Sequence, residues 1–113
     1  MADYETLRAW QSARALSIGA HLLARGHWTP SSAEALDQVR RAALSIQLNI
    51  AEGYAFKPAP KWKYHLRIAL GSAYESTDGL HHLLAVCGAP SEKILPLIAE
   101  AKRTVSLLRG LLR

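Results

Sequence analysis

Five polar residues near the middle of the chain could support metal binding or proton transfer. They are Arg40, Arg41, Asn49, Glu52 and Glu75. Carboxylates on facing helices can bind a metal ion or move a proton. Di-iron bundles, however, carry Glu-x-x-His motifs on two helices, and this chain contains none. We therefore interpret these residues as a structural polar network, in which Arg41 forms an ion pair with Glu75 and Asn49 and Glu52 hold the helix register.

The histidines offer a second set of candidate ligands. They are His21, His27, His65, His81 and His82. Asp78 and His82 are four residues apart, so on a helix they would share one face and could share a metal ion. No third ligand is evident in the sequence. We therefore predict that the histidines lie on the surface and that there is no metal site.

Enzyme signatures are missing from the sequence. We find no nucleotide-binding loop, no nucleophile elbow and no catalytic triad in a recognisable context. The single cysteine, Cys87, allows no internal disulfide and suits a reducing compartment. Asp3 and Glu5 lie in an N-terminal stretch without an apolar core, which argues against a signal peptide. These features predict a cytoplasmic protein that is not an enzyme and needs no cofactor.

The segment of residues 54–67 is the most suggestive of binding. It contains four cations, Lys57, Lys61, Lys63 and Arg67, and no acid. It also contains the aromatic residues Tyr54, Phe56, Trp62 and Tyr64. Clustered cations neutralise phosphates, and exposed aromatic rings stack on unpaired bases. The segment therefore indicates RNA or DNA binding as one hypothesis. The alternative is that Trp62 caps a core and the lysines are a solvated helix end.

Overall charge and hydropathy are compatible with either interpretation. The chain has 113 residues, a formal net charge of +5 and 50% hydrophobic residues, which is enough for one domain over residues 1–113 with an apolar core. A positive balance favours an anionic partner without specifying one. No run of 18 apolar residues occurs, so we expect no membrane span and no membrane partner.

Apolar residues recur at spacings of three and four throughout the chain, which is typical of helices. Breakers at residues 26–30, 57–60 and 88–90 divide the sequence into helices of about residues 4–25, 31–56, 61–86 and 91–113. We expect Asp3 to cap the first helix and Gly26 to end it in a left-handed conformation. Four helices joined by short loops predict an all-α fold, an antiparallel up-down-up-down four-helix bundle.

The tight turn at residues 57–60 also predicts the register between the second and third helices. If the two helices are antiparallel, Ser45 lies opposite Ser72, and Arg41 lies level with Glu75. Small residues then meet at the centre of this helix pair. Gly71 lies in the interior of the third helix, where glycine costs about 1 kcal/mol relative to alanine. We therefore expect Gly71 to have a packing role.

Several of these segments resemble a known family. The run QVRRAALSIQLNIAEGY at residues 38–54 resembles the signature of the 23S rRNA-intervening sequence protein family, also called the four helix bundle protein family. LRAWQSARAL, LRIALGSAYES and the leucine-rich last helix are also similar to that family. More distantly, the chain is similar to the accessory variability determinant of diversity-generating retroelements, a basic bundle that binds nucleic acid and a reverse transcriptase.

The resemblance implies a bacterial homopentamer with no established catalysis. Apolar residues outside the helix seams, on the first and fourth helices, would then form subunit contacts. We expect the protein to be an oligomer that binds RNA or DNA through Lys57, Lys61, Lys63 and Arg67. The alternative is a protein–protein interaction scaffold whose basic charge is incidental, with another protein as its partner.

Overall fold

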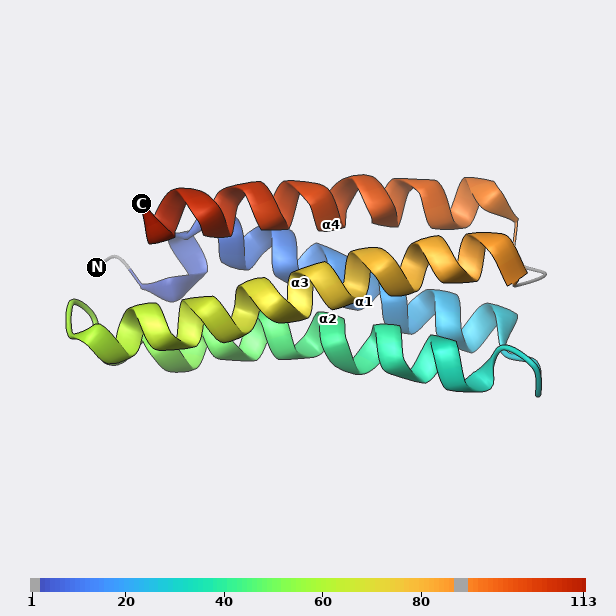
Figure 1. The fold of residues 1–113 in the computed structure, drawn as a ribbon, viewed down its shortest axis with the longest axis horizontal. Helices are drawn as coiled ribbons and strands as arrows, with labels where there is room; N and C mark the ends of the chain where they lie inside the picture. Colours follow the sequence, from blue (N-terminus) through green and yellow to red (C-terminus); the bar gives the residue numbers. More distant parts are fainter. Residues whose placement is uncertain (1–2, 87–89) are drawn as a thin grey trace.

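The computed structural model describes residues 3–86 and 90–113, and within them the chain forms an antiparallel four-helix bundle (Figure 1). The helices are α1 (Arg8–His27), α2 (Ala33–Tyr54), α3 (Pro60–Val86) and α4 (Ser91–Leu112). Each helix contacts the one before and the one after it, and α1 also contacts α4, which closes the ring. The predicted up-down-up-down topology is confirmed. Cys87 and residues 88–89 of the last predicted turn lie outside the described residues.

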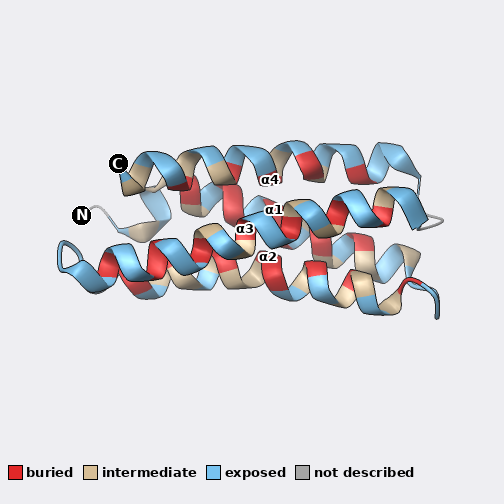
Figure 2. Ribbon diagram, viewed as in Figure 1, coloured by how far each residue is buried: buried red, intermediate tan, exposed pale blue. Residues whose placement is uncertain are grey.

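The core consists of the apolar stripes that the spacing predicts, one from each helix. These stripes face inward while the outer surfaces of all four helices are exposed (Figure 2). In α2 the seam residues Leu36, Val39, Ala43, Ile46 and Ile50 are all buried. Within the described residues, no helix combines the length and the apolar character needed to cross a membrane.

The start and the end of α1 differ from the predicted ones. Tyr4–Thr6 form a separate 3₁₀ turn, because Leu7 is extended (φ −73°, ψ 126°) and separates this turn from α1. Asp3 does act as a cap, but of the short turn, where its carboxylate accepts from the Tyr4 amide over 2.8 Å. At the other end α1 continues through Gly26 to His27. The predicted left-handed glycine is wrong, since no described glycine has a positive φ.

Two glycines allow α2 and α3 to approach closely. A Cβ atom on Gly53 would lie 2.5 Å from the Cβ of His65, and one on Gly79 would lie 2.7 Å from the Cγ2 of Val39. The packing role predicted for Gly71 is wrong, because Gly71 is exposed and a Cβ atom there would meet nothing within 4 Å. Gly53 and Gly79 are therefore two of the small residues at which α2 and α3 approach closely.

Candidate nucleic-acid interface

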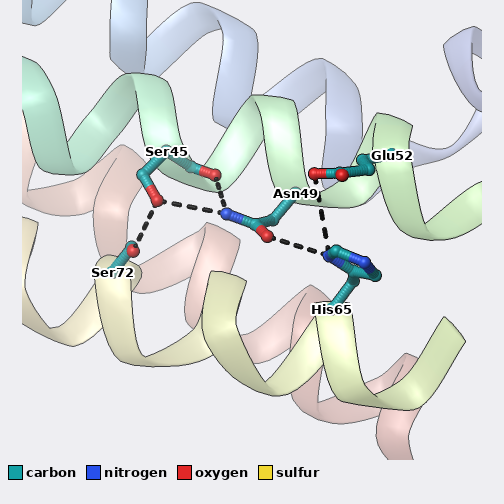
Figure 3. A network of polar contacts seen from close by, with 5 residues as sticks. All are labelled: Ser45, Asn49, Glu52, His65 and Ser72. Atoms are coloured by element: carbon teal, nitrogen blue, oxygen red, sulfur yellow. Dashed lines mark hydrogen bonds and ion pairs between the residues drawn. The ribbon is translucent and has the colours of Figure 1, made fainter. Parts of the chain in front are cut away.

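A chain of hydrogen bonds joins α2 to α3 along their contact (Figure 3). The hydroxyl oxygens of Ser45 and Ser72 are 2.9 Å apart, which confirms the predicted register. Asn49 donates from Nδ2 to the backbone oxygen of Ser45 over 2.9 Å and lies 3.2 Å from the Ser45 hydroxyl. Because a carbonyl oxygen only accepts, this bond directs the Asn49 Oδ1 atom away from Ser45 and toward α3.

His65 on α3 completes this network. Its Nδ1 atom lies 3.0 Å from Asn49 Oδ1 and 3.9 Å from a carboxylate oxygen of Glu52 (Figure 3). Since Asn49 Oδ1 is an acceptor, Nδ1 of His65 carries a proton and donates it. The His65 residue is only 6% exposed, and its Nε2 atom has no hydrogen-bond partner among the described residues. The prediction of a surface histidine is therefore wrong for His65.

The position of His65 carried a signal that the sequence analysis missed. His65 lies three residues after Trp62 and four before Ala69, and both of these residues are buried. This spacing places all three side chains on one face of a helix. The periodic pattern that identified the core of α3 therefore also included the histidine.

Arg41 and Glu75, the other two residues of the predicted network, do not take part in the hydrogen bonds around Asn49. Arg41 donates to Gln38 one turn away on its own helix, over 2.9 Å, and forms no ion pair with Glu75 among the described residues. Arg41 is exposed, and an exposed ion pair gains little over solvation by water. Glu75 instead lines a groove between α2 and α3, of about 500 Å³, together with Glu34, Asp78 and His82.

A second buried polar contact, which the sequence analysis did not predict, joins α1 to α4. The hydroxyl groups of Ser12 and Thr104 are 2.7 Å apart, and Ser12 also donates to the Glu100 carboxylate. Thr104 donates to the backbone oxygen of Glu100 over 2.9 Å. Ser12 and Thr104 are both nearly fully buried. Small hydroxyl side chains thus meet in two of the four pairs of neighbouring helices, α2–α3 and α1–α4.

The four cations of the predicted interface lie together at the start of α3 and in the turn before it. Lys57, Lys61, Lys63 and Arg67 are all exposed. The Nζ atom of Lys61 lies 4.3 Å from the centre of the Phe56 ring, and that of Lys57 lies 5.4 Å from the Tyr54 ring. These contacts are short enough for cation–π attraction, so the ammonium groups are held beside aromatic rings at the surface.

The aromatic residues of this segment divide into two groups. Trp62 is only 6% exposed and packs edge-to-face against the half-buried Tyr54, with ring centres 5.8 Å apart. Trp62 therefore belongs to the core and is not available to stack on a base. Phe56 and Tyr64 remain 38% and 58% exposed, and Phe56 is stacked on His65. The interface that the sequence predicted accordingly has two exposed aromatic rings.

No metal centre is formed by the side chains that the structure describes. Within residues 3–86 and 90–113, no three His, Cys, Asp or Glu side chains lie close enough together to hold a metal ion. Polar side chains between the helices are instead bonded to one another, as at the partly buried Ser45 and Ser72, although the Nε2 atom of His65 has no partner among the described residues. The charged outer surface is therefore the better candidate for a functional site.

Comparison with protein families agrees with the architecture. The family model described as 23S rRNA-intervening sequence protein matches residues 5–110. The chain belongs to this family. The match extends from the 3₁₀ turn into the last turn of α4, so the intervening-sequence family accounts for the whole bundle. No curated protein matches the chain, and the more distant similarity to the accessory variability determinant stays a prediction.

Proposed function

We propose that this intervening-sequence family member is a non-enzymatic, oligomeric protein of the cytoplasm that binds RNA or DNA. Its contacts with phosphates come from Lys57, Lys61, Lys63 and Arg67. The supporting observation is the charge at the start of α3. Residues 53–74 contain these four cations and no acid, and the first turn of α3 has no acidic residue.

Helix stability does not explain this arrangement. The amino end of a helix carries a partial positive charge, so acidic residues stabilise it and cations destabilise it. Lys61 and Lys63 lie in the first turns of α3 without a compensating acid nearby in the sequence. A local excess of positive charge that the fold does not need is typical of a surface that meets an anionic partner.

Salt-dependent binding tests the proposal directly. We expect labelled RNA or DNA to bind with an affinity that falls steeply between about 50 and 200 mM salt. The double variant Lys63→Glu/Arg67→Glu should weaken binding. The control Arg14→Glu/Lys93→Glu changes the net charge equally at two exposed positions outside the segment, and it should bind nearly as the parent does. Equal loss in both variants, or binding insensitive to salt, would refute a specific role for the segment.

Oligomerisation belongs to the same proposal. Ile18, Leu22 and Leu95 are between 44% and 57% exposed on α1 and α4, as expected of residues that contact another subunit. We propose the homopentamer that the family resemblance implies. Five copies of a +5 chain would repeat the same basic surface around one assembly, and such multivalency raises the apparent affinity of weak contacts. Light scattering measures the mass, and a monomer would refute the pentamer.

A second candidate function is a protein–protein interaction scaffold. It is favoured by an apolar hollow of about 400 Å³ between α1 and α4, whose lining includes Leu22, Pro96 and Leu97. If a protein partner occupies this hollow, binding should depend little on salt, because apolar contacts release no counterions. The variant Leu22→Glu should then abolish partner binding, whereas Lys63→Glu/Arg67→Glu should leave partner binding unchanged.

A further inference from the structure

A groove runs between α3 and α4, which lie side by side in the bundle (Figure 1). Its volume is about 640 Å³. Leu70 of α3 contributes to its apolar floor together with Val105 and Leu112 of α4. The polar lining groups are Lys102, Ser106 and Arg109 of α4 and Arg113, which follows α4. The sequence analysis did not single out any of the α4 cations, because they are more than thirty residues away from the basic segment.

Helical spacing extends this groove toward the basic segment. On α3, Arg67 lies three residues before Leu70 and Tyr74 lies four residues after it, so both share the face that Leu70 turns to the groove. Lys63 is one further turn along the same face. On α4, Lys102, Ser106, Arg109 and Arg113 are spaced by four, three and four residues, which is one continuous stripe.

The charged side chains that line the groove, Lys102, Arg109 and Arg113, are all cations. Residues 60–74 and 101–113 contain seven Lys and Arg residues and no acid. Within the described residues, none of these cations forms an ion pair. The nearest acid in the sequence of α4, Glu100, turns to the opposite side and binds Ser12 of α1. The positive potential of this face is therefore not cancelled by neighbouring carboxylates.

The helix dipole explains only part of the pattern. Cations stabilise the carboxyl end of a helix, which accounts for Arg109 in the last turn of α4. It does not account for Lys102 in the middle of α4, nor for Lys63 and Arg67 near the amino end of α3. The cations that line the groove thus come from the α4 side, and Lys63 and Arg67 continue the cationic face along α3 by helical spacing, where they add nothing to helix stability.

We propose that the α3–α4 groove binds the sugar–phosphate backbone of a single-stranded nucleic acid. This inference rests on the proposed function and extends it to residues that the sequence did not indicate. The stripe from Lys102 to Arg113 is about 16 Å long, from the rise of 1.5 Å per residue. A stripe of that length can contact several consecutive phosphates of one strand.

Two features select a single strand over a duplex. Axes of packed helices are about 8–10 Å apart, so the groove between them can hold one backbone but cannot enclose a double helix. Tyr74 is 48% exposed, and its spacing from Leu70 places it on the face of α3 next to the groove. Tyr64, nearer the amino end of α3, is 58% exposed. Aromatic rings next to a cationic groove stack on unpaired bases and are typical of proteins that bind single strands.

The decisive variant is Lys102→Glu/Arg109→Glu, tested by fluorescence anisotropy with labelled oligouridine about 12 nucleotides long. Each lost phosphate contact reduces the magnitude of the slope of log affinity against log salt by about 0.7. We therefore expect the slope of the variant to be shallower by about 1.4 and its affinity to be at least tenfold lower. The matched control is Lys93→Glu/Arg103→Glu, two exposed cations of α4 that do not line the groove. It should retain most of the affinity and of the slope.

The outcomes separate the two proposals. If the parent protein binds oligouridine and Lys102→Glu/Arg109→Glu binds as well as its control, the groove inference is wrong and the proposed function stands. If the parent binds no nucleic acid, the proposed function itself fails. If the groove variant changes the mass of the free protein by light scattering, the groove is a subunit interface and the inference is overturned. Circular dichroism confirms folding, and Lys102→Gln/Arg109→Gln replaces the variant if charge reversal unfolds it.

A second comparison tests the preference for single strands. Tyr74→Ala should lower the affinity for oligouridine by about tenfold, because stacking on an aromatic ring contributes this much per base. Binding of an RNA duplex of the same length should be weaker in the parent protein and unaffected by Tyr74→Ala. Tighter binding of the duplex, or an unchanged affinity of Tyr74→Ala for oligouridine, would overturn the assignment to a single strand.

Discussion

Asn49 on α2 accepts a hydrogen bond of 3.0 Å from the ring nitrogen Nδ1 of His65 on α3. This contact connects the interior of the bundle to the surface, because the buried His65 ring also stacks against the exposed Phe56 ring. The orientation of Asn49 is determined by its own bond to the Ser45 backbone. The network therefore fixes the position of the His65 ring, on which the exposed Phe56 ring stacks. Disrupting the network should lower the stability of the protein.

The first prediction concerns this hydrogen bond. Asn49→Ala removes the one acceptor that lies within hydrogen-bond distance of His65 Nδ1 among the described residues. An unsatisfied buried donor costs about 1–3 kcal/mol, so the free energy of unfolding in urea should fall by about that amount. The control Gln38→Ala changes an exposed amide of the same helix and should alter stability by less than about 0.5 kcal/mol. Equal stabilities of the two variants would contradict the role of Asn49.

The second prediction compares two glycines by the same substitution. Gly53→Ala places a Cβ atom 2.5 Å from His65 Cβ and 3.0 Å from the Trp62 ring. The helices must separate to relieve this contact, and overpacking of this kind costs about 1–3 kcal/mol. Gly71→Ala meets nothing within 4 Å and should stabilise α3 by about 1 kcal/mol, because alanine favours the helix.

Thermal unfolding followed by circular dichroism measures both glycine variants under the same conditions. The decisive result is the sign of the difference from the parent protein, negative for Gly53→Ala and positive for Gly71→Ala. A stabilised Gly53→Ala variant would show that α2 and α3 are not closely packed at this end of the bundle.

The third prediction tests the hydroxyl contact between α1 and α4. Ser12→Ala leaves the buried Thr104 hydroxyl and the Glu100 carboxylate without a partner from α1. We expect a loss of about 1 kcal/mol. In a double-mutant cycle with Thr104→Val, the two losses should not add, because both substitutions disrupt one contact. Additive losses would indicate that the two hydroxyl groups act independently, and Ser106→Ala serves as an exposed control on α4.

The fourth prediction separates core from surface aromatic residues. Trp62→Ala should destabilise the bundle by about 3–5 kcal/mol, since a buried tryptophan is removed. Tyr64→Ala removes a ring that is 58% exposed, so stability should change little while nucleic-acid affinity falls. Urea unfolding and anisotropy on the same two variants give the comparison. A stable Trp62→Ala variant with reduced affinity would reverse the division of roles.

Ser45 and Ser72 show how far the sequence can predict a contact between helices. The turn at residues 57–60 is short, so the antiparallel register follows from counting, and the two hydroxyl groups meet at 2.9 Å. The same counting placed Arg41 level with Glu75, but no ion pair forms between them. A long exposed side chain has many conformations, and Arg41 bonds to the nearer Gln38.

His65 shows the opposite case, in which a residue type was misleading. A histidine is often exposed, whereas the position of His65 between Trp62 and Ala69 places it inside. Its burial also requires Gly53, which lies twelve residues earlier and leaves room for the histidine Cβ. The identity of one residue on α2 thus decides whether a polar ring on α3 can be enclosed.

The sequence by itself determined the four helices, their topology and the apolar seams, because these depend on spacings of three and four residues within each helix. The tertiary structure alone decided which polar groups meet, as at Ser12 and Thr104, and which cations share a groove, as do Lys102 and Arg109 beside α3. The reason is physical. Helical periodicity is a local property of the chain, whereas contacts between helices depend on how each helix is rotated about its axis and on how closely small residues allow two helices to approach.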